Sequence, residues 1–184
     1  MKRYLFTILI IISTTLFSYG GAGIFEYYIG INDNGSTNTY GTNVSGFGGN
    51  IATVNMASYS LSIAFTGCKV FEDGGDDANA ARMYYRVYKN GSTSTFSSRN
   101  LPQLGSQSGN NTEWNSGSSI NLLSGVTTIG TYVVEIYYEV DISANGGGGF
   151  QVFSPNQGSS YSATFEVTSA YPVTFTHFST ENTG

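Results

Sequence analysis

Residues 130–140 read GTYVVEIYYEV, and this stretch decides the class of fold. Apolar and aromatic side chains fall on every second position from Tyr132 to Val140, and the positions between them include Glu135 and Glu139. Successive side chains of a β-strand point to opposite faces, so one face of this segment is predicted to meet a core and the other to meet water. Such one-sided alternation is typical of antiparallel sheets.

The same period of two recurs in both directions along the chain. Residues 59–65 and 161–167 alternate in this way, and six further strands are predicted at Ile24–Ile31, Lys69–Glu72, Arg82–Tyr88, Thr95–Ser98, Ser119–Leu122 and Val173–Phe178. Pairs of Asn or Asp with Gly, which tolerate positive φ, provide turns at 34–35, 73–75, 90–91 and 145–146. This pattern predicts an all-β fold, an antiparallel β-sandwich of immunoglobulin-like or jelly-roll-like type, with a closed barrel as the alternative.

Composition limits the classes of function. At 184 residues the chain is long enough for one well-filled domain, and 14 Tyr and 12 Phe give it too much apolar surface for a disordered chain. Only 10% of the residues are charged, and the net charge is −5. Because such a surface repels phosphate backbones, we expect no nucleic-acid partner. Cys68 is the only cysteine, so we predict no disulfide within the chain and a small, buried, apolar role for this side chain.

The first residues are typical of an export signal. A basic start and an apolar run over residues 5–12 are followed by small residues. The run is shorter than the roughly 20 residues that span a bilayer. We therefore predict a cleaved signal helix over residues 1–22, a mature chain that begins near Gly21 or Gly23, and no transmembrane span after cleavage. The alternative is an uncleaved N-terminal anchor helix.

The motifs also occur in an order that resembles a known module. An opening strand is followed by Tyr84-Tyr85-Arg86-Val87-Tyr88 before an Asn-Gly turn, and then by Leu101-Pro102, Trp114, Ile120–Gly125, Gly130–Glu135 and Ser162–Val167. This order is similar to that of an uncharacterised β-sandwich module in proteins exported by the bacterial type IX secretion system. The resemblance implies a β-sandwich over residues 23–169 and a secreted or outer-cell-surface location, and it carries no established activity.

The C-terminal residues extend this resemblance. Residues 172–176, Pro-Val-Thr-Phe-Thr, resemble the strand that opens the stem domain before the sorting signal of such proteins. The resemblance implies that residues 170–184 are a linker and the first strand of a truncated stem domain, and that the chain is part of a longer protein. We expect this tail to pack poorly and to be clipped easily by proteases.

One predicted strand carries a pattern suited to ligand binding. Four of its side chains share one face and combine aromatic rings with guanidinium donors, which suits sugar rings or an acidic polysaccharide. They are Arg82, Tyr84, Arg86 and Tyr88. The same spacing also fits cross-strand pairing with the acidic residues of 130–140. In that alternative the two strands are antiparallel neighbours, with Arg82 near Glu139 and Arg86 near Glu135.

Trp114 is a further candidate for ligand binding. It lies in a polar stretch, where an exposed indole would stack on a sugar ring. The alternative is a tryptophan that closes one end of the sandwich core.

A short acidic turn is the candidate for a metal site. Glu72, Asp73, Asp76 and Asp77 flank two glycines and offer the oxygen ligands that Ca²⁺ prefers. Their spacing does not match an EF-hand loop, and the alternative is a plain solvated turn between strands. We expect that removal of Ca²⁺ would change the stability little.

The residues needed for catalysis are missing from the pattern. His177 is the one histidine and has no partner for a zinc site or a Ser-His-Asp triad. Glu135 and Glu139 lie roughly 13 Å apart along a strand, beyond the ~5–9.5 Å between hydrolase carboxylates. We therefore predict no enzyme activity and no cofactor.

The leading hypothesis is a non-catalytic secreted or cell-surface binding or display module, carbohydrate-binding or adhesin-like, whose partner is a polysaccharide or cell-surface glycan. The alternative is a structural spacer domain of a larger secreted protein or enzyme.

Overall fold

The computed structural model describes residues 21–56, 59–106 and 111–169. Within these ranges the chain forms twelve strands and no helix. The strands are β1 (Ala22–Asp33), β2 (Ser36–Gly41), β3 (Asn50–Asn55), β4 (Leu61–Glu72), β5 (Asp77–Lys89), β6 (Ser97–Leu101), β7 (Gln103–Ser106), β8 (Asn111–Ser116), β9 (Ile120–Asn121), β10 (Gly130–Ser143), β11 (Gly149–Ser154) and β12 (Tyr161–Thr168). The predicted signal helix, apart from its last two residues, and the predicted strand Val173–Phe178 lie outside the described residues.

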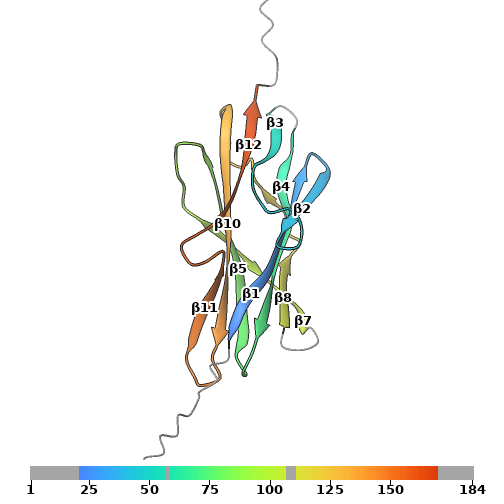
Figure 1. Cartoon of the computed structure of the whole chain (residues 1–184). Coiled ribbons are helices and arrows are strands. Elements are labelled where there is room, and N and C mark those ends of the chain that lie inside the picture. The colour runs from blue at the N-terminus through green and yellow to red at the C-terminus, as the bar shows by residue number, and fades with distance from the viewer. Residues whose placement is uncertain (1–20, 57–58, 107–110, 170–184) are drawn as a thin grey trace, which may run out of the picture.

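The strands form the predicted all-β sandwich of two sheets (Figure 1). The first sheet has the order β2-β1-β4-β8-β7, with β9 beside β4, and the second has the order β3-β12-β10-β5-β6, with β11 beside β10. Every pairing between described strands is antiparallel except that of β3 with β12, which is parallel. The second sheet is therefore mixed, because β3 is reached from a strand of the other sheet and no hairpin fixes its direction.

The longest strand, β10, organises the second sheet. It pairs with β5 along one side, and on the other side it pairs with β12 over residues 130–136 and with β11 over 138–143. Residues 155–160 connect β11 to β12 along this divided edge. This connection matters below because it borders the candidate site.

The core lies between the two sheets. Its largest fully buried side chains are Tyr138, Phe165, Ile29, Ile31, Leu61, Ile63, Met83, Leu122, Ile136, Ile142, Val54 and Val70. The hydroxyl of Tyr138 lies 2.7 Å from Thr66 Oγ1 and donates to the carbonyl oxygen of Tyr28 at 3.1 Å, so it links the sheets through the middle of the core. The hydroxyl of Tyr132 donates to the carbonyl oxygen of Thr128 at 3.0 Å, four residues upstream, an arrangement found in immunoglobulin-like sandwiches.

The buried role predicted for Cys68 is confirmed. Its side chain is fully buried on β4, and burial together with the charge of Glu113 raises the pKa of the thiol to about 12. A thiol with so high a pKa is protonated at neutral pH and acts as a small apolar group.

The observed strands differ from the predicted ones in several bounds, and five of them were not predicted. Residues 59–65 and Lys69–Glu72, predicted as two strands, belong to the single strand β4, which begins at Leu61. The strand predicted at Thr95–Ser98 begins at Ser97 instead, and β2, β3, β7, β8 and β11 were not predicted. These segments are rich in Ser, Thr, Asn, Gln and Gly, so hydrogen bonding to a neighbouring strand forms them without an apolar stripe of their own.

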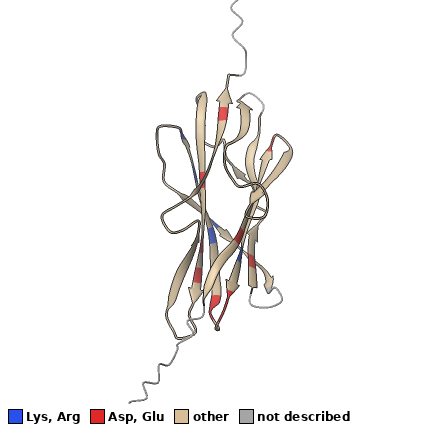
Figure 2. Cartoon of the chain, viewed as in Figure 1, with Lys and Arg blue, Asp and Glu red and all other residues tan. Residues whose placement is uncertain are grey.

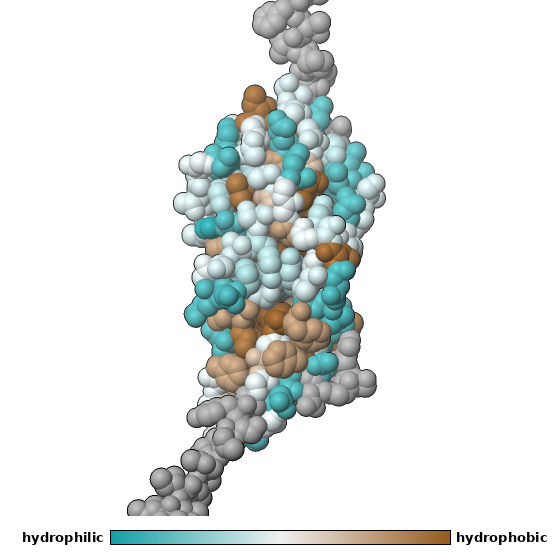
Figure 3. Space-filling model, in the orientation of Figure 1, coloured by the Kyte–Doolittle hydropathy of each residue, from teal (hydrophilic) through white to brown (hydrophobic). Residues whose placement is uncertain are grey.

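The face of the molecule seen in Figure 3 is mostly polar or pale in hydropathy where residues are described. Apolar side chains reach it near one end, where β1 runs close to β11. Phe25 and Phe150 on these strands are 43% and 40% exposed. Among the described residues, no helix has the length and apolar character needed to cross a membrane.

Candidate functional site

The outer side of the second sheet holds the arginine and tyrosine residues predicted to bind ligand. β5 and β10 are antiparallel neighbours, with Arg86 opposite Glu135 and Arg82 opposite Glu139, so the predicted cross-strand pairing is confirmed. Arg82 Nη1 lies 2.8 Å from Glu139 Oε1, and Arg86 Nε donates to Glu135 Oε2 at 2.6 Å. We give the name β5–β10 face to the outward side chains of these two strands, which are Arg82, Tyr84, Arg86, Tyr88, Glu135, Tyr137, Glu139 and Asp141.

The aromatic rings of the β5–β10 face are fixed by one another and by the carboxylates. Tyr84 and Tyr137 stack with their ring centroids 4.6 Å apart and their planes 5° from parallel. Tyr84 donates to Glu139 Oε1 at 3.2 Å, and Tyr88 donates to Glu135 Oε1 at 2.9 Å. Offset stacking and hydrogen bonds to charged acceptors both favour a single arrangement of these side chains.

Phe96 completes the aromatic cluster from the chain between β5 and β6. Its ring meets Tyr137 edge-on, at 5.0 Å between centroids and 77° between planes. The guanidinium carbon of Arg86 lies 4.3 Å from the centre of the Phe96 ring and 5.2 Å from that of Tyr88. These contacts hold Phe96 and Tyr137 in a fixed relation before any ligand arrives.

The titration of the β5–β10 face follows from these contacts. The hydrogen bond from Arg82, and then that from Gln151, lowers the pKa of Asp141. Burial, followed by the charge of Glu139, raises the pKa of Tyr84, and burial followed by the hydrogen bond to Glu135 raises that of Tyr88. At neutral pH the tyrosines are therefore hydroxyl donors and Asp141 is an anion.

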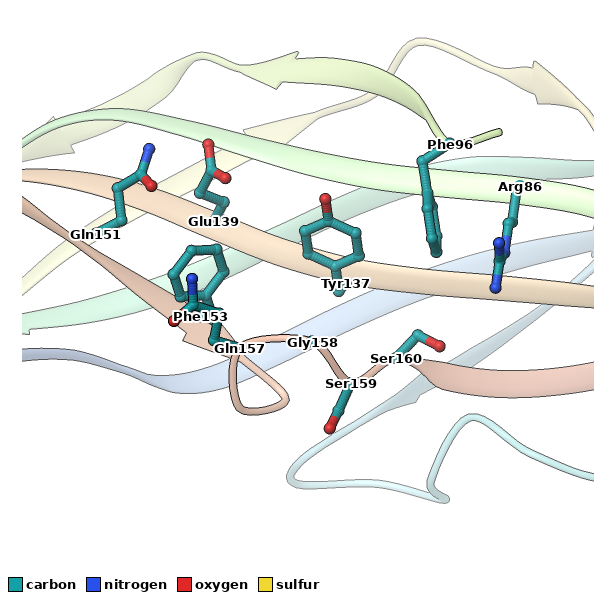
Figure 4. Close-up of a pocket in the computed structure, with 10 residues that line it drawn as sticks. All are labelled: Arg86, Phe96, Tyr137, Glu139, Gln151, Phe153, Gln157, Gly158, Ser159 and Ser160. Atoms are coloured by element: carbon teal, nitrogen blue, oxygen red, sulfur yellow. The ribbon is translucent and has the colours of Figure 1, made fainter. Parts of the chain in front are cut away.

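A hollow of about 400 Å³ opens beside this network. Its lining residues are Arg86, Phe96, Tyr137, Glu139, Gln151, Phe153, Gln157, Gly158, Ser159 and Ser160. Figure 4 shows Tyr137 between Phe96 and Phe153, with residues 157–160 of the β11–β12 connection along one side. Aromatic faces surrounded by amide and hydroxyl groups suit a ligand that is apolar on one side and rich in hydroxyls at its rim.

Most of this lining was not predicted from the sequence, since Arg86 is the one predicted ligand-binding residue among the ten. Phe96, Gln151, Phe153 and residues 157–160 lie in segments without alternation, and only the tertiary fold brings them to β10. Asp141 pairs with Arg82 Nη2 at 2.8 Å. This residue could have been predicted, because it is the next alternate position after Glu139 on the outward side of β10.

Trp114 does not join the β5–β10 face. It lies on β8 in the first sheet, is 6% exposed, and donates from Nε1 to Thr112 Oγ1 at 3.2 Å. The prediction that its indole is open to a sugar is therefore wrong, and the alternative, a tryptophan of the core, is the one observed. A polar neighbourhood in the sequence concealed it, because alternate residues of β8 face the core.

The acidic turn between β4 and β5 is held by hydrogen bonds. Figure 2 shows acidic residues gathered at this end of the sandwich. Glu72 accepts from Thr112 at 2.6 Å, Asp73 from the Gly74 amide at 2.7 Å, and buried Asp76 from the Asn145 amide at 3.0 Å. In the described ranges no three His, Cys, Asp or Glu side chains gather as a metal site would require, and His177 lies outside those ranges. Asp77 is exposed at the start of β5, and Ca²⁺ binding at this turn stays a prediction.

Comparison with known proteins gives little to transfer. No family model and no curated protein matches the chain. Among solved structures it is similar to AggA, the major subunit of aggregative adherence fimbriae type I from Escherichia coli, with 14% identity and a TM-score of 0.34 over 77% of this chain and 95% of that chain. Likeness at this level carries no argument about function, so the function is argued from the site.

Proposed function

We propose that this chain is a non-catalytic module, secreted or held at the outer cell surface, that binds carbohydrate in the hollow beside the β5–β10 face. The observation that carries the proposal is Tyr137. Its ring lines the hollow, is held in place by Tyr84 and Phe96, and has the neutral polar groups of Gln151 and Ser159 in the same lining.

The fixed geometry of the rings favours binding. A pyranose has apolar C–H faces that pack on an aromatic ring and hydroxyls at its rim that need hydrogen-bond partners. Because Tyr137 and Phe96 are already held by their neighbours, they lose little side-chain entropy when a sugar packs on them. Phe153 supplies a further apolar wall of the same hollow.

The carboxylates of the face argue for binding without catalysis. Glu135 and Glu139 are each engaged in an ion pair with an arginine of β5. They also stand four residues apart on one strand, roughly 13 Å, whereas hydrolase carboxylates are ~5–9.5 Å apart. The location outside the cell rests on the export signal predicted over residues 1–22 and on the resemblance to exported proteins.

A glycan array with the purified chain tests the proposal. We expect binding to at least one glycan, and Tyr137→Ala to weaken it by about tenfold or more because the stacking surface is lost. Phe71→Ala is the matched control, since it removes a 42% exposed ring from β4 in the other sheet. Equal losses in both variants, with both still folded, would contradict the proposed site.

A spacer is the second candidate function, favoured by the shape of the module. β1 begins at one end of the long axis and β12 ends at the other (Figure 1), so the module adds its full length to a chain that runs through it. A blank glycan array, with the folded state verified by circular dichroism, would make the spacer the better function.

A further inference from the structure

We propose, on the basis of the proposed function, that the ligand of the hollow is a neutral glycan and that the two arginines of the β5–β10 face serve as internal counter-ions. The face has the composition of a site for anions, with two guanidinium groups among aromatic rings. Its hydrogen bonds, however, direct these guanidinium groups to the protein itself.

Arg86 illustrates this most fully. Its Nε and Nη2 both approach Glu135 Oε2, at 2.6 Å and 2.5 Å. Its Nη1 donates to Thr93 Oγ1 at 3.3 Å and to the carbonyl oxygen of Ser94 at 3.0 Å. All three nitrogens of the guanidinium are thus engaged, and its planar surface is covered by Phe96 at 4.3 Å. A carboxylate or sulfate of a ligand would have to displace one of these partners to reach it.

The guanidinium group of Arg82 is also paired with carboxylates of the protein. Its Nη1 pairs with Glu139 and its Nη2 with Asp141, both at 2.8 Å. Two arginines against three carboxylates (Glu135, Glu139 and Asp141) leave this network with a net charge of −1. An anionic polysaccharide would therefore meet weak repulsion where the sequence suggests attraction.

The other polar groups of the hollow fit uncharged hydroxyls. Gln151, Gln157, Ser159 and Ser160 contribute amides and hydroxyls, each of which both donates and accepts. Among the residues that line the hollow, Arg86 and Glu139 are the charged ones, and each is already in an ion pair. This combination of aromatic rings and neutral hydrogen-bonding groups matches a neutral hexose or pentose polymer.

The test compares two panels of soluble polysaccharides by affinity electrophoresis of the full chain. The neutral panel is dextran, mannan and xylan, and the acidic panel is alginate and polygalacturonate. We expect a neutral polymer to bind with an affinity that changes less than about threefold between about 50 mM and about 500 mM NaCl, because no counter-ion is released. We expect no binding of the acidic panel.

A charge variant makes the role of the arginines testable. Glu135→Gln removes the carboxylate that occupies Arg86, so we expect salt-sensitive binding of polygalacturonate to appear. Glu166→Gln is the control, because Glu166 is exposed on β12 of the same sheet and the substitution changes the net charge equally. Melting curves of both variants establish that they are folded.

Each outcome separates this inference from the function on which it rests. Binding of an acidic polymer by the unaltered chain, weakened by salt, would overturn the neutral-ligand inference and leave carbohydrate binding standing. Equal behaviour of Glu135→Gln and Glu166→Gln would overturn the counter-ion role of the arginines. If neither panel binds and the glycan array is also blank, it is the proposed function that fails.

Discussion

The two outer faces of the sandwich use aromatic residues differently. On the first sheet, aromatic side chains from one strand cover glycines of its neighbour. Phe65 covers Gly30 and Tyr28 covers Gly67, and a Cβ placed on Gly23 would lie 2.6 Å from the Phe71 ring. On the β5–β10 face no glycine lies beneath the rings, and Tyr84 and Tyr137 stand stacked on each other.

This difference bears on the hollow beside the β5–β10 face, because the stacked ring of Tyr137 is part of its lining. An aromatic side chain that covers a glycine fills the space above the neighbouring strand. Rings that stack on one another stand away from the sheet and leave a wall for a ligand to pack against.

The largest expected effect comes from filling one of the covered glycines. A Cβ at Gly67 would overlap the Tyr28 hydroxyl and lie 2.7 Å from the carbonyl oxygen of Trp114, so backbone as well as side chain must move. We expect Gly67→Ala to lower the free energy of unfolding by about 1–3 kcal/mol, the usual cost of overpacking, measured by urea denaturation.

The control for this variant lies on the outer side of the second sheet. Ser162 is exposed on β12, and Ser162→Ala should change the free energy of unfolding by no more than about 0.5 kcal/mol. If Gly67→Ala were as harmless as Ser162→Ala, the rings of the first sheet would not be packed as described.

A smaller effect is expected from the ion pairs on the two faces. Lys69 pairs with Glu26 on the first sheet through one nitrogen at 2.9 Å, whereas Arg86 engages Glu135, two other acceptors and two rings. We expect Arg86→Met to cost about 1–2 kcal/mol and Lys69→Met less than about 1 kcal/mol, because both pairs are partly exposed and screened. Chemical denaturation of the two variants measures the difference, and a larger cost for Lys69→Met would contradict the comparison.

The sequence was sufficient to predict which side chains of β5 and β10 face outward and which of them pair. The alternation of β10 fixes which of its side chains face outward, and the matching series on β5 fixes the partners, so the Arg86–Glu135 and Arg82–Glu139 pairs were predictable from spacing alone. The all-β class followed from the same period.

The hollow was not predictable in the same way. It needs Phe96 from one loop and residues 157–160 from another to meet Tyr137, and no local pattern encodes a meeting between segments about 60 residues apart. The burial of Trp114 was not predictable for a related reason, since it depends on the sheet that covers β8 and not on the polar neighbours of Trp114 in the sequence. Local periodicity thus predicts faces of strands, while sites formed between loops require the tertiary fold.

The smallest expected effect is a pH dependence of stability caused by Asp141 on β10. The hydrogen bond from Arg82 lowers the pKa of Asp141 below its ordinary value of 3.8. A carboxyl whose pKa is lower in the folded state stabilises the fold above the ordinary pKa, and this contribution disappears as the pH falls through the folded-state pKa. Asp141→Asn should therefore be less stable than the unaltered chain near neutral pH, and the two should converge below about pH 3.8. Thermal melting across this range measures the convergence. In an Arg82→Met background the main cause of the shift is gone, so Asp141→Asn should then have a smaller effect near neutral pH. An undiminished effect in that background would mean that Gln151, which donates to Asp141 Oδ1 at 2.9 Å, and not Arg82, holds the carboxylate in its ionised form.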